Sequence, residues 1–326
     1  MCHRTVFLNF SHFTFYISLH LQDGGYLMLI IVHGGIYIEE IPNISDILKK
    51  ACLTGRDALL YKEAVDAVEE AVKVLEDDPR LDAGTGSYPN LLGEIEMSAS
   101  IMKDDLSCGG VAAIKNIKNP ISVARGVMEQ TRHVLLVGEG ANLFAKLLGF
   151  EPYNPVAELT VTTLRKAIEI AEKEERSIYH YYLERARHRL KELQLGTVGS
   201  VAIDGVKRKA AATSTGGIEM QLPGRVGDSP LIGLGTFAGE WGAVSMTGAG
   251  EGIIKLGLAR KIADWMEDMD AQSAVDRGMA LAKKHQVVCG AIALSCREEI
   301  GLGQNSGMMS YAYWKDGMDE PITHLS

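Results

Sequence analysis

The sequence predicts an α/β fold built in layers around a mostly antiparallel sheet. Two observations lead to this prediction. Buried strands and amphipathic helices alternate in the first part of the chain, whereas the second part carries four short strands separated mainly by turn residues. Strands that follow each other without helical crossovers pair antiparallel, and helices from both parts must then cover the outer faces of the sheet. This pattern excludes a doubly wound parallel sheet.

The first elements are a strand and a long helix. Residues 27–32 (LMLIIV) form a continuous apolar run that ends at Gly34 and Gly35, which predicts a fully buried strand. Residues 57–76 repeat alanine, valine and leucine at helical spacing, with acids and lysine elsewhere on the wheel. We expect one helix here, lying on a sheet.

A long loop separates this helix from the next one. Residues 77–94 are dense in glycine, proline, aspartate and asparagine, which form turns. Residues 119–130 then begin with Asn119 as the N-cap and Pro120 at the first helical position, the expected start of a helix. Residues 134–140 (VLLVGEG) predict another buried strand.

The second half begins after a charged connection. Residues 156–195 are mostly helix formers with ionic side chains, which predicts charged helix or a mobile connection across the surface. The short strands that follow are expected at residues 197–204, 207–217, 241–248 and 287–295. One helix is expected between the third and fourth of these strands, at residues 251–267, with a second one directly after it at residues 271–285.

The composition narrows the class of partner. At 326 residues the chain is long enough for one large domain or two ordinary ones. Its formal net charge is −9 and its lysines and arginines are dispersed, which argues against nucleic acid and membrane surfaces as partners. Five cysteines without a C-x-x-C pair indicate neither a disulfide framework nor a zinc site. We therefore expect a small-molecule partner and a reducing, cytoplasmic setting.

The first 27 residues differ from the rest. They are rich in aromatic and apolar residues, but Asn9, Ser11 and His12 interrupt the apolar run and no small-residue cleavage site follows. They therefore predict neither a secretory signal nor a membrane span. Because the strand-like run opens at Met28, we interpret residues 1–27 as a misplaced start or a disordered extension. A native protein whose mass begins at Met1 would contradict this interpretation.

Two glycine-rich stretches admit a different class of function. Residues 247–255 (TGAGEGIIK) have the form of a phosphate-cradling turn before a helix, but they lack the full P-loop pattern. Residues 233–239 (GLGTFAG) follow no convincing strand, so they are weaker still as a dinucleotide fingerprint. A nucleotide- or phosphate-binding module therefore stays an alternative. It predicts thermal stabilisation by nucleotide and an uncut chain.

Threonines at strand ends, among small residues, carry the chemistry that the sequence favours. They are Thr197, Thr213, Thr215 and Thr247. Threonine is common in strands for packing reasons alone. The glycines that follow Thr215 and Thr247, however, leave backbone N–H groups uncovered, as a site that stabilises a developing oxyanion requires.

A charged pair lies in the glycine-flanked turn PGRVGDS, at Arg225 and Asp228. A guanidinium grips a carboxylate through two hydrogen bonds, and an aspartate accepts hydrogen bonds from an ammonium. The pair therefore suits the two ends of a free amino acid. The plain alternative is a surface ion pair, which would contribute little free energy.

A series of stretches in this chain resembles the plant-type L-asparaginases, also called isoaspartyl peptidases, of the N-terminal nucleophile hydrolase superfamily. In chain order they read HGG, LEDDPRLDAGTGS, ASIM, KNPISVAR, HVLLVGEGA, GTVGSVA, ATSTGG, PGRVGDSPLIGLGTFA and SMTGAGE. The resemblance runs from about Met28 to the C-terminus. It implies a four-layer αββα sandwich with mostly antiparallel sheets.

The resemblance also implies that the precursor cuts itself between Gly196 and Thr197. Residues 28–196 then form an α subunit, with a charged linker at residues 155–196, and residues 197–326 form a β subunit of the same domain. A threonine hydroxyl needs an adjacent base to act as a nucleophile. The α-amino group freed by the cut is that base, since its reference pKa is about 7.7 to 8.0.

The roles of individual residues follow from the resemblance. Thr197 is the nucleophile, Thr215 hydrogen-bonds near it, and Thr247 with the backbone of Gly248 forms the oxyanion hole. The substrate-binding positions are Gly217, Arg225, Val226, Gly227, Asp228, Thr247, Gly248, Ala249 and Gly250, of which the arginine and the aspartate hold the substrate's α-carboxylate and α-amino group. The implied reaction is acyl transfer, with L-asparagine or a β-aspartyl dipeptide as the small-molecule substrate.

No redox cofactor or catalytic metal is implied. By analogy with the family, backbone carbonyls hold a structural sodium ion in the loop after the first long helix, with candidates at Leu75, Glu76, Asp77, Asp82 and Gly84. Such ligation leaves almost no side-chain pattern in a sequence. The family further implies self-association of the cleaved subunits as (αβ)2.

Four residues depart from the family pattern. Ile36 and Tyr37 stand in place of small residues, Asp82 stands where asparagine is usual, and Tyr88 replaces a smaller residue. Bulk at Ile36 is expected to narrow the pocket or move the loop. A carboxylate at Asp82 would raise the pKa of a nearby amino base and repel an acidic substrate.

Two other members of the superfamily stay alternatives. A glycosylasparaginase would carry a secretory signal and disulfides, and neither is visible in the sequence. A threonine endopeptidase would need a larger protein-binding surface.

Overall fold

The computed structural model describes residues 4–10, 13–19, 26–37, 43–175, 177–180, 182 and 196–325. The predicted charged connection therefore lies partly outside the described residues. Strands β1 (Arg4–Phe10) and β2 (Phe13–Leu19) pair antiparallel with each other as a sheet of two. The interpretation of residues 1–27 as an extension stays a prediction.

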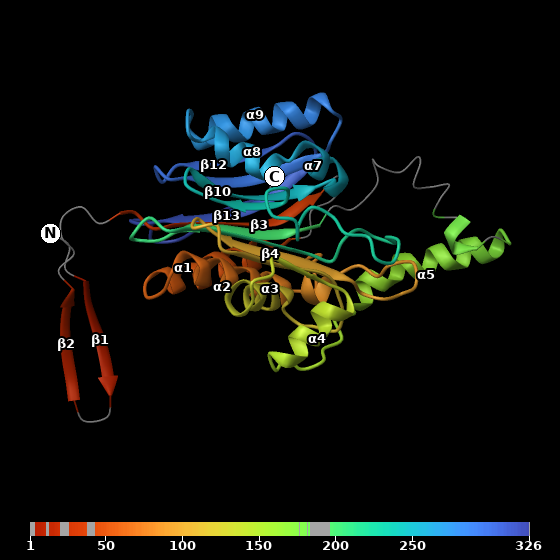
Figure 1. Ribbon diagram of the computed structural model, residues 1–326, viewed down its shortest axis with the longest axis horizontal. Coiled ribbons are helices and arrows are strands. Elements are labelled where there is room, and N and C mark those ends of the chain that lie inside the picture. The colour runs from red at the N-terminus through yellow and green to blue at the C-terminus, as the bar shows by residue number, and fades with distance from the viewer. Residues whose placement is uncertain are drawn as a thin grey trace.

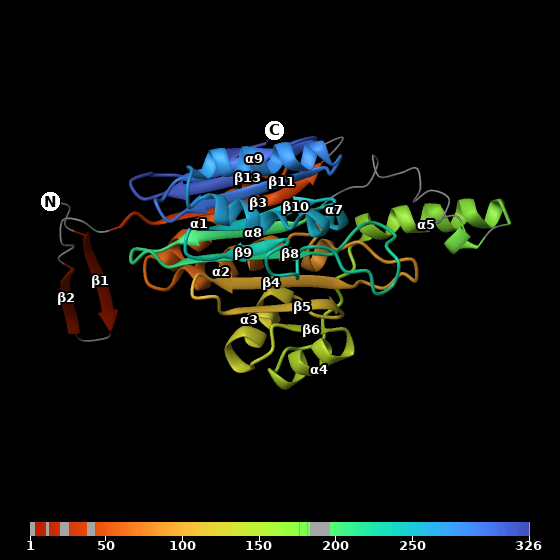
Figure 2. The ribbon, with the colours of Figure 1, turned by 45° about the horizontal axis from the view of Figure 1, so that its top comes forward.

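The larger sheet has eight strands in the described part of the chain. In sheet order they are β14 (Ile322–His324), β13 (Met308–Lys315), β3 (Leu29–Tyr37), β7 (Val198–Ile203), β8 (Lys209–Thr215), β4 (Met97–Lys103), β5 (Cys108–Ile114) and β6 (Leu135–Val137). All neighbours run antiparallel except β5 and β6, which are parallel. Figure 2 shows β13, β3, β8, β4, β5 and β6 following one another across the molecule.

A second sheet of four strands faces the first. Its order is β12 (Ile300–Gln304), β11 (Cys289–Ser295), β10 (Gly242–Gly248) and β9 (Thr236–Ala238), and all its pairs are antiparallel. The strands expected in the second half of the chain are confirmed as β7, β8, β10 and β11.

Helices cover the outer faces of both sheets. On the larger sheet these are α1 (Ser45–Leu59), α2 (Ala64–Glu76), α3 (Pro120–Gln130) and α4 (Glu139–Leu147). On the smaller sheet they are α7 (Gly250–Leu256), α8 (Leu258–Trp265) and α9 (Ala271–Lys284). Figure 1 shows the resulting stack of helix, sheet, sheet and helix. The predicted four-layer sandwich is therefore confirmed.

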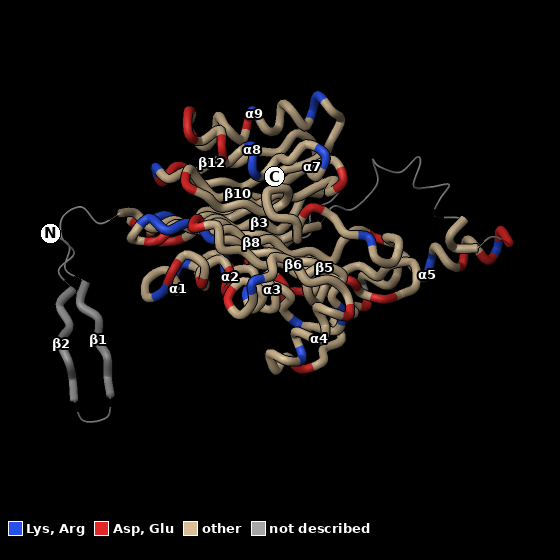
Figure 3. Tube along the Cα trace, in the orientation of Figure 1, with Lys and Arg blue, Asp and Glu red and all other residues tan. Residues whose placement is uncertain are grey.

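The layers are held together by two apolar cores. One core lies between the larger sheet and helices α1 to α3, and the other fills the space between the sheets and beneath α8 and α9. Lysine, arginine and acidic residues lie mainly on the helices and loops, while the centre of the stack carries few charges (Figure 3). None of the described helices is both long enough and apolar enough to cross a membrane.

The connection after α4 contributes one more helix, α5 (Glu158–Lys173). Its apolar side chains Leu164 and Ala167 pack with Leu91 and Met220 in a small separate cluster. The charged helix predicted for this connection is therefore confirmed in its described first part.

Both long helices predicted from periodicity are divided. The helix expected at residues 57–76 is two, because Glu63 is extended and its N–H donates to the Asp66 carboxylate at 2.9 Å, which starts α2. The helix expected at residues 251–267 is also two, because Gly257 adopts a left-handed conformation with φ of 63°. Apolar spacing continued through both breaks and concealed them.

Two strand predictions were wrong in detail. The run 27–32 does not end at Gly34 and Gly35, because β3 continues to Tyr37. The stretch 134–140 is a half-exposed edge strand rather than a buried one, and its last residues begin α4. Pro120 does open α3, but the Asn119 side chain makes no capping hydrogen bond, and the Glu76 carboxyl accepts from the N–H of Ile121 instead.

Candidate active site

The predicted nucleophile lies on the face of the larger sheet that meets the smaller sheet. Thr197 directly precedes β7 and is buried. Its hydroxyl donates to the carbonyl oxygen of Gly196 at 2.6 Å and lies 3.3 Å from Oγ1 of Thr215. Thr215 Oγ1 in turn lies 3.3 Å from the same carbonyl oxygen and accepts a hydrogen bond from the N–H of Gly217 at 3.0 Å. Two hydroxyls thus lie at the carbonyl group of the peptide bond that self-cleavage would break.

The backbone around this bond leaves no room for side chains. A Cβ on Gly196 would collide with the side chain of Asp82, and its distance to Asp82 Oδ2 would be 3.2 Å. Gly35 has φ of +104°, and a Cβ there would lie 3.1 Å from the backbone nitrogen of Thr197. Glycine is therefore required at position 196, before the bond, and at position 35, where another strand packs against the bond. Gly35 is part of the HGG stretch but was not given a role from the sequence.

The predicted oxyanion hole lies at the end of β10. Thr247 is fully buried, and its hydroxyl has no hydrogen-bond partner among the described residues. Gly248 follows with φ of +131°, where a Cβ would collide with Val288 and Cys289, and Ala249 donates its N–H to the Val288 carbonyl at 2.8 Å. A buried hydroxyl without a partner is costly, so a bound group that accepts its hydrogen would be favoured.

The predicted clamp residues lie together around Gly250. A Cβ on Gly250 would lie 2.8 Å from Oδ1 of Asp228 and 3.1 Å from Nη2 of Arg225. Gly227 is equally close to the guanidinium, and Val226 is half-buried in the same turn. The structure thus brings Arg225 and Asp228 together with Gly227 and Gly250, whereas a Cβ on Gly217 would meet the side chain of Gln221.

The two clamp side chains differ in their partners. Arg225 donates from Nε and Nη2 to the two carboxylate oxygens of Glu251, each at 2.9 Å. Asp228 is buried and its Oδ2 has no hydrogen-bond partner among the described residues. Burial raises the pKa of Asp228 to about 7, although the charge of Arg225 opposes the rise. Glu251 was missed as a site residue, although it is the acid in the first turn of the helix after TGAG.

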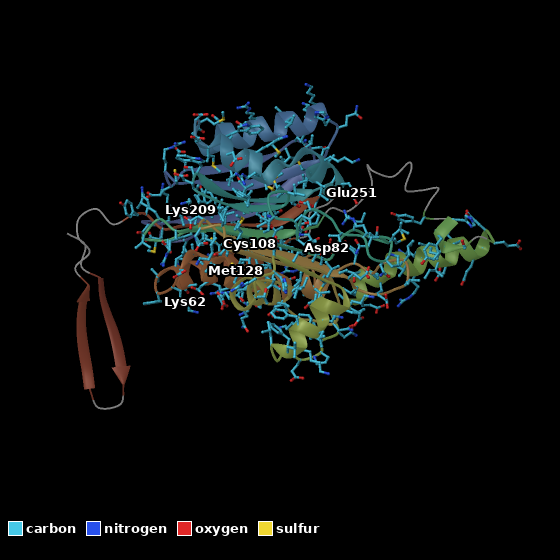
Figure 4. All side chains as sticks on the ribbon, in the orientation of Figure 1. Lys62, Asp82, Cys108, Met128, Lys209 and Glu251 are labelled. Carbon is cyan, nitrogen blue, oxygen red and sulfur yellow. The ribbon has the colours of Figure 1, made fainter. Side chains whose placement is uncertain are left out.

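Asp82 lies against Gly196, beside the Gly196–Thr197 bond. Its Oδ1 accepts from the N–H of Tyr88 at 3.2 Å, its backbone carbonyl accepts from the N–H of Gly216 at 2.9 Å, and its Oδ2 has no partner in the described structure. Burial raises the pKa of this carboxyl well above its ordinary value. Figure 4 places Asp82 and Glu251 at the same end of the sheets, opposite Lys62 and Lys209.

The other departures from the family pattern have structural partners. Ile36 is fully buried in the core between the sheets, and Tyr37 turns its hydroxyl back to the carbonyl of Gly34 at 3.0 Å. The bulk of Ile36 is therefore absorbed by the core of the protein.

Backbone carbonyls lie close to two glycines in the loop after α2. A Cβ on Gly84 would collide with the carbonyl of Glu76, and a Cβ on Gly86 with that of Leu81. Backbone oxygens are ligands that hard cations take. Three of the carbonyls expected to bind sodium already accept backbone hydrogen bonds, namely those of Leu75, Asp82 and Gly84.

The charged side chains beside this loop are already paired. The Asp77 carboxylate accepts from Lys118 Nζ at 2.9 Å. The Glu76 carboxyl is fully buried and accepts from Ser214 and from the N–H of Ile121. Only carbonyl oxygens are therefore left here for a cation.

The chain is similar to known proteins over most of its length. A family model described as asparaginase matches residues 27–323. The chain is 46% identical over 303 residues to the plant-type L-asparaginase of Thermococcus kodakarensis, which covers 90% of this chain and 98% of the relative. It is 45% identical over 303 residues to the plant-type L-asparaginase of Pyrococcus horikoshii, covering 90% of this chain and 99% of the relative. It is also 40% identical over 298 residues to the isoaspartyl peptidase/L-asparaginase of Homo sapiens, covering 89% and 94% of the two chains. A match that spans nearly all of the fold and contains every predicted site residue shows that this chain belongs to the asparaginase family.

Proposed function

We propose that this protein is a self-cleaving amidohydrolase that converts L-asparagine to L-aspartate and ammonia and cleaves β-aspartyl dipeptides. The observation that carries the proposal is the geometry at Gly196–Thr197, where the threonine hydroxyl lies 2.6 Å from the preceding carbonyl oxygen. The names of the relatives support both substrates, since they read L-asparaginase and isoaspartyl peptidase/L-asparaginase.

Self-cleavage begins with attack by the Thr197 hydroxyl on the carbonyl carbon of Gly196. The new C–O bond forms, the C–N bond breaks, and the hydroxyl proton ends on the nitrogen of Thr197. Water then hydrolyses the ester, which leaves a carboxylate on Gly196 and a free amine and hydroxyl on Thr197. Thr215, which lies 3.3 Å from both the hydroxyl and the carbonyl oxygen, holds the attacking group in place.

Substrate hydrolysis repeats this chemistry on a side-chain amide. The freed α-amino group of Thr197 takes the proton of its own hydroxyl, and the oxygen attacks the substrate's amide carbon. Negative charge on the carbonyl oxygen is met by the unpartnered hydroxyl of Thr247 and the N–H of Gly248. Ammonia or an amino acid leaves with the proton, and water releases aspartate from the acyl-enzyme.

The clamp selects a free amino acid end on the substrate. Asp228 has a buried oxygen without a partner, which an ammonium group would satisfy. Arg225 binds the α-carboxylate, and Glu251 fixes the plane of its guanidinium through two hydrogen bonds. A larger glycosylated or protein substrate would need room beyond this pair, so glycosylasparaginase and endopeptidase activities are the less favoured alternatives.

No redox cofactor or catalytic metal takes part in this mechanism. We propose a structural sodium ion in the loop beside Gly84, with the carbonyl of Glu76 among its ligands. Such an ion would stiffen the loop that carries Asp82 and supply no chemistry.

We further propose that the protein self-associates and works in the cytoplasm. Apolar side chains stand exposed at two neighbouring elements, with Leu143 and Leu147 one helical turn apart on α4 and Val134 and Val137 at β6. A second copy of the chain would cover this face, giving (αβ)2 after cleavage. Size-exclusion chromatography with light scattering at several concentrations tests the assembly.

Intact-mass analysis of the incubated protein, beside a Thr197→Ala variant, tests the proposed function. We expect two fragments from the natural chain, the second beginning at Thr197, and one uncut chain from the variant. Assays with L-asparagine and a β-aspartyl dipeptide should then show activity only in the cut protein. The nucleotide-binding alternative would be favoured instead if the natural chain stays uncut and inactive and if added nucleotide raises its melting temperature.

A further inference from the structure

A row of buried polar side chains crosses from one sheet to the other just behind the site. Nε2 of His33 lies 3.0 Å from Ser245 Oγ, which lies 2.7 Å from Thr213 Oγ1. Thr236 Oγ1 donates to Thr213 at 2.6 Å, and Ser100 Oγ lies 2.9 Å from Thr236. We call these five residues the polar row. It ends where Ser100 donates to the carbonyl oxygen of Ser229 at 2.6 Å.

All members of the polar row are fully buried, and they come from strands that are far apart in the sequence. His33, Thr213 and Ser100 lie on β3, β8 and β4 of the larger sheet, and Ser245 and Thr236 lie on β10 and β9 of the smaller sheet. Much of the remaining space between the sheets is filled by apolar side chains. Polar groups in such surroundings are tolerated only when their hydrogen bonds are made.

Each part of the polar row is next to a residue of the site. Thr213 and Ser245 precede Thr215 and Thr247 by two positions, so along each strand they share a face with the catalytic hydroxyl. His33 pairs with Gly199, which follows Thr197 by two positions on β7. The carbonyl at the other end of the row belongs to Ser229, the residue after Asp228.

The hydrogen bonds of the polar row form a continuous chain. Thr236 donates to Thr213, either hydroxyl of the Thr213–Ser245 pair can be the donor, and Ser245 Oγ meets His33 at Nε2. Burial lowers the pKa of His33 to about 3, with only partial opposition from the backbone of Thr197. The ring is therefore neutral.

We propose that the polar row is a positioning device that sets the register of the two sheets, and so the distances from Thr247 to Thr197 and to Thr215. Apolar contacts between sheets resist sliding weakly because they have no direction, whereas a chain of hydrogen bonds fixes both position and rotation. Misplacement by about 1 Å can lower a catalysed rate by about 100-fold. In this proposal His33, Ser245 and Thr213 position the nucleophile and the oxyanion hole. Thr236 and Ser100 position the turn that carries Asp228. The inference rests on the proposed function.

Substitutions along the polar row test the proposal. Thr213→Val removes the central hydroxyl at nearly constant shape, and Thr213→Ser keeps it. We expect Thr213→Val to lower kcat for L-asparagine about 10- to 100-fold and to slow self-cleavage, with recovery to within about threefold in Thr213→Ser. Thr236→Val, at a position nearer the clamp, should instead act mainly on KM. The factor by which KM rises should be about ten times the factor by which kcat falls.

Ser200→Ala is the matched control. Ser200 is equally buried and lies on β7, but its hydroxyl donates to the carbonyl of Ile31 outside the polar row. It should leave kcat and KM within about twofold of the natural values. Ser245→Ala replaces Thr213→Val if the latter fails to fold, and the same loss of kcat is expected from it.

The outcomes separate a positioning role from a merely structural one. If Thr213→Val and Ser245→Ala lower the melting temperature but keep kcat and KM at temperatures where they are folded, the proposal is overturned. If the natural chain and Ser200→Ala neither cut themselves nor hydrolyse asparagine, it is the proposed function that fails, and the positioning role falls with it.

Discussion

The site is made of two regions, and each contains a buried carboxyl in different surroundings. At the scissile bond, Asp82 is enclosed by glycine backbone on two sides, since a Cβ on either Gly196 or Gly216 would collide with it. At the clamp, Asp228 shares its surroundings with the charge of Arg225 and the space beside Gly250. Both carboxyls keep one oxygen without a hydrogen-bond partner in the described structure.

Their pKa values show how these surroundings act. Burial raises the pKa of both groups, and that of Asp228 reaches about 7, where a cationic ligand can still favour loss of its proton. The pKa of Asp82 is raised well above its ordinary value, although the charge of Arg225 opposes the rise there as well. We infer that Asp228 is built to become charged when substrate arrives, whereas Asp82 fills space as a neutral acid.

The largest expected effect comes from Asp228→Asn. Loss of a buried carboxylate that pairs with a substrate ammonium costs about 2–5 kcal/mol, so kcat/KM should fall about 30- to 4,000-fold at pH 8. Self-cleavage, which needs no ammonium group, should continue at its natural rate. Steady-state kinetics and intact mass measure the two effects, and Glu240→Gln, at an exposed carboxyl outside the site, is the control. Equal loss of both activities would contradict the separation of the regions.

The same variant should gain stability. A carboxyl whose folded pKa is raised binds a proton more tightly in the fold, so its contribution to stability falls as pH rises from about 3.8 to about 7. Asp228→Asn removes this loss, which reaches at most about 4 kcal/mol above pH 7. Its melting temperature at pH 8 should therefore exceed that of the natural chain, in a variant that has lost its activity.

Gly196→Ala should act in the other region, at the Gly196–Thr197 bond. A Cβ there collides with Asp82 beside the bond to be cut, so we expect self-cleavage to slow by about 100-fold or more. Combining it with Asp82→Gly should restore part of the rate, because the colliding side chain is gone. Gly140→Ala, where a Cβ would meet nothing within 4 Å, is the control. Rapid cleavage of Gly196→Ala would show that the backbone can relax around the methyl group.

The parts of the site that could be predicted from the sequence lie on short, continuous stretches. Thr215 and Thr247 end strands that alternate clearly, and glycines follow them, so strand, turn and hydroxyl are all visible locally. Arg225 and Asp228 share one turn. Their functional assignment came from the resemblance to a family, while the local pattern supplied only their chemical suitability.

What could not be predicted depends on contacts between distant strands. The local pattern around Asp82 is that of a loop carboxyl, and only the resemblance to the family placed it near the active site. Its burial against Gly196 and Gly216 is visible in the structure alone. The polar row joins five strands whose pairing has no local pattern. The breaks between α1 and α2 and at Gly257 were concealed because apolar spacing runs through them.

The pH dependence should report the clamp and the nucleophile together. Asp228 must lose its proton to bind the ammonium, with a pKa of about 7, and the amine of Thr197 must be neutral to accept a proton. Both requirements lower kcat/KM as pH falls, by about tenfold per unit for each group once pH is below its pKa. A profile measured from pH 5 to 9 should therefore steepen below pH 7, and Asp228→Asn should lose that steeper part. If kcat/KM of the natural enzyme falls with pH as expected for a single titrating group, this assignment is contradicted.

Glu251→Gln should have a smaller effect. Glu251 is mostly exposed, so its ion pair with Arg225 contributes about 0–1 kcal/mol, but its two hydrogen bonds orient the guanidinium. We expect KM for asparagine to rise about two- to fivefold with kcat unchanged. Glu267→Gln, at another exposed carboxyl, serves as the control. A fall in KM would show that Glu251 competes with the substrate's carboxylate instead of positioning its partner.

Asp82→Asn should have the smallest effect, although it is chemically the same change as Asp228→Asn. A neutral carboxylic acid and an amide have nearly the same shape, and the amide oxygen can still accept from the N–H of Tyr88. Self-cleavage and kcat/KM should both stay within about twofold of the natural rates. The pH profile gives the sharper measurement, because a charged Asp82 would raise the pKa of the Thr197 amine and its removal would shift the acid side of the profile to lower pH. An unshifted profile means that burial keeps the proton on Asp82, and that the two regions differ in charge as well as in shape.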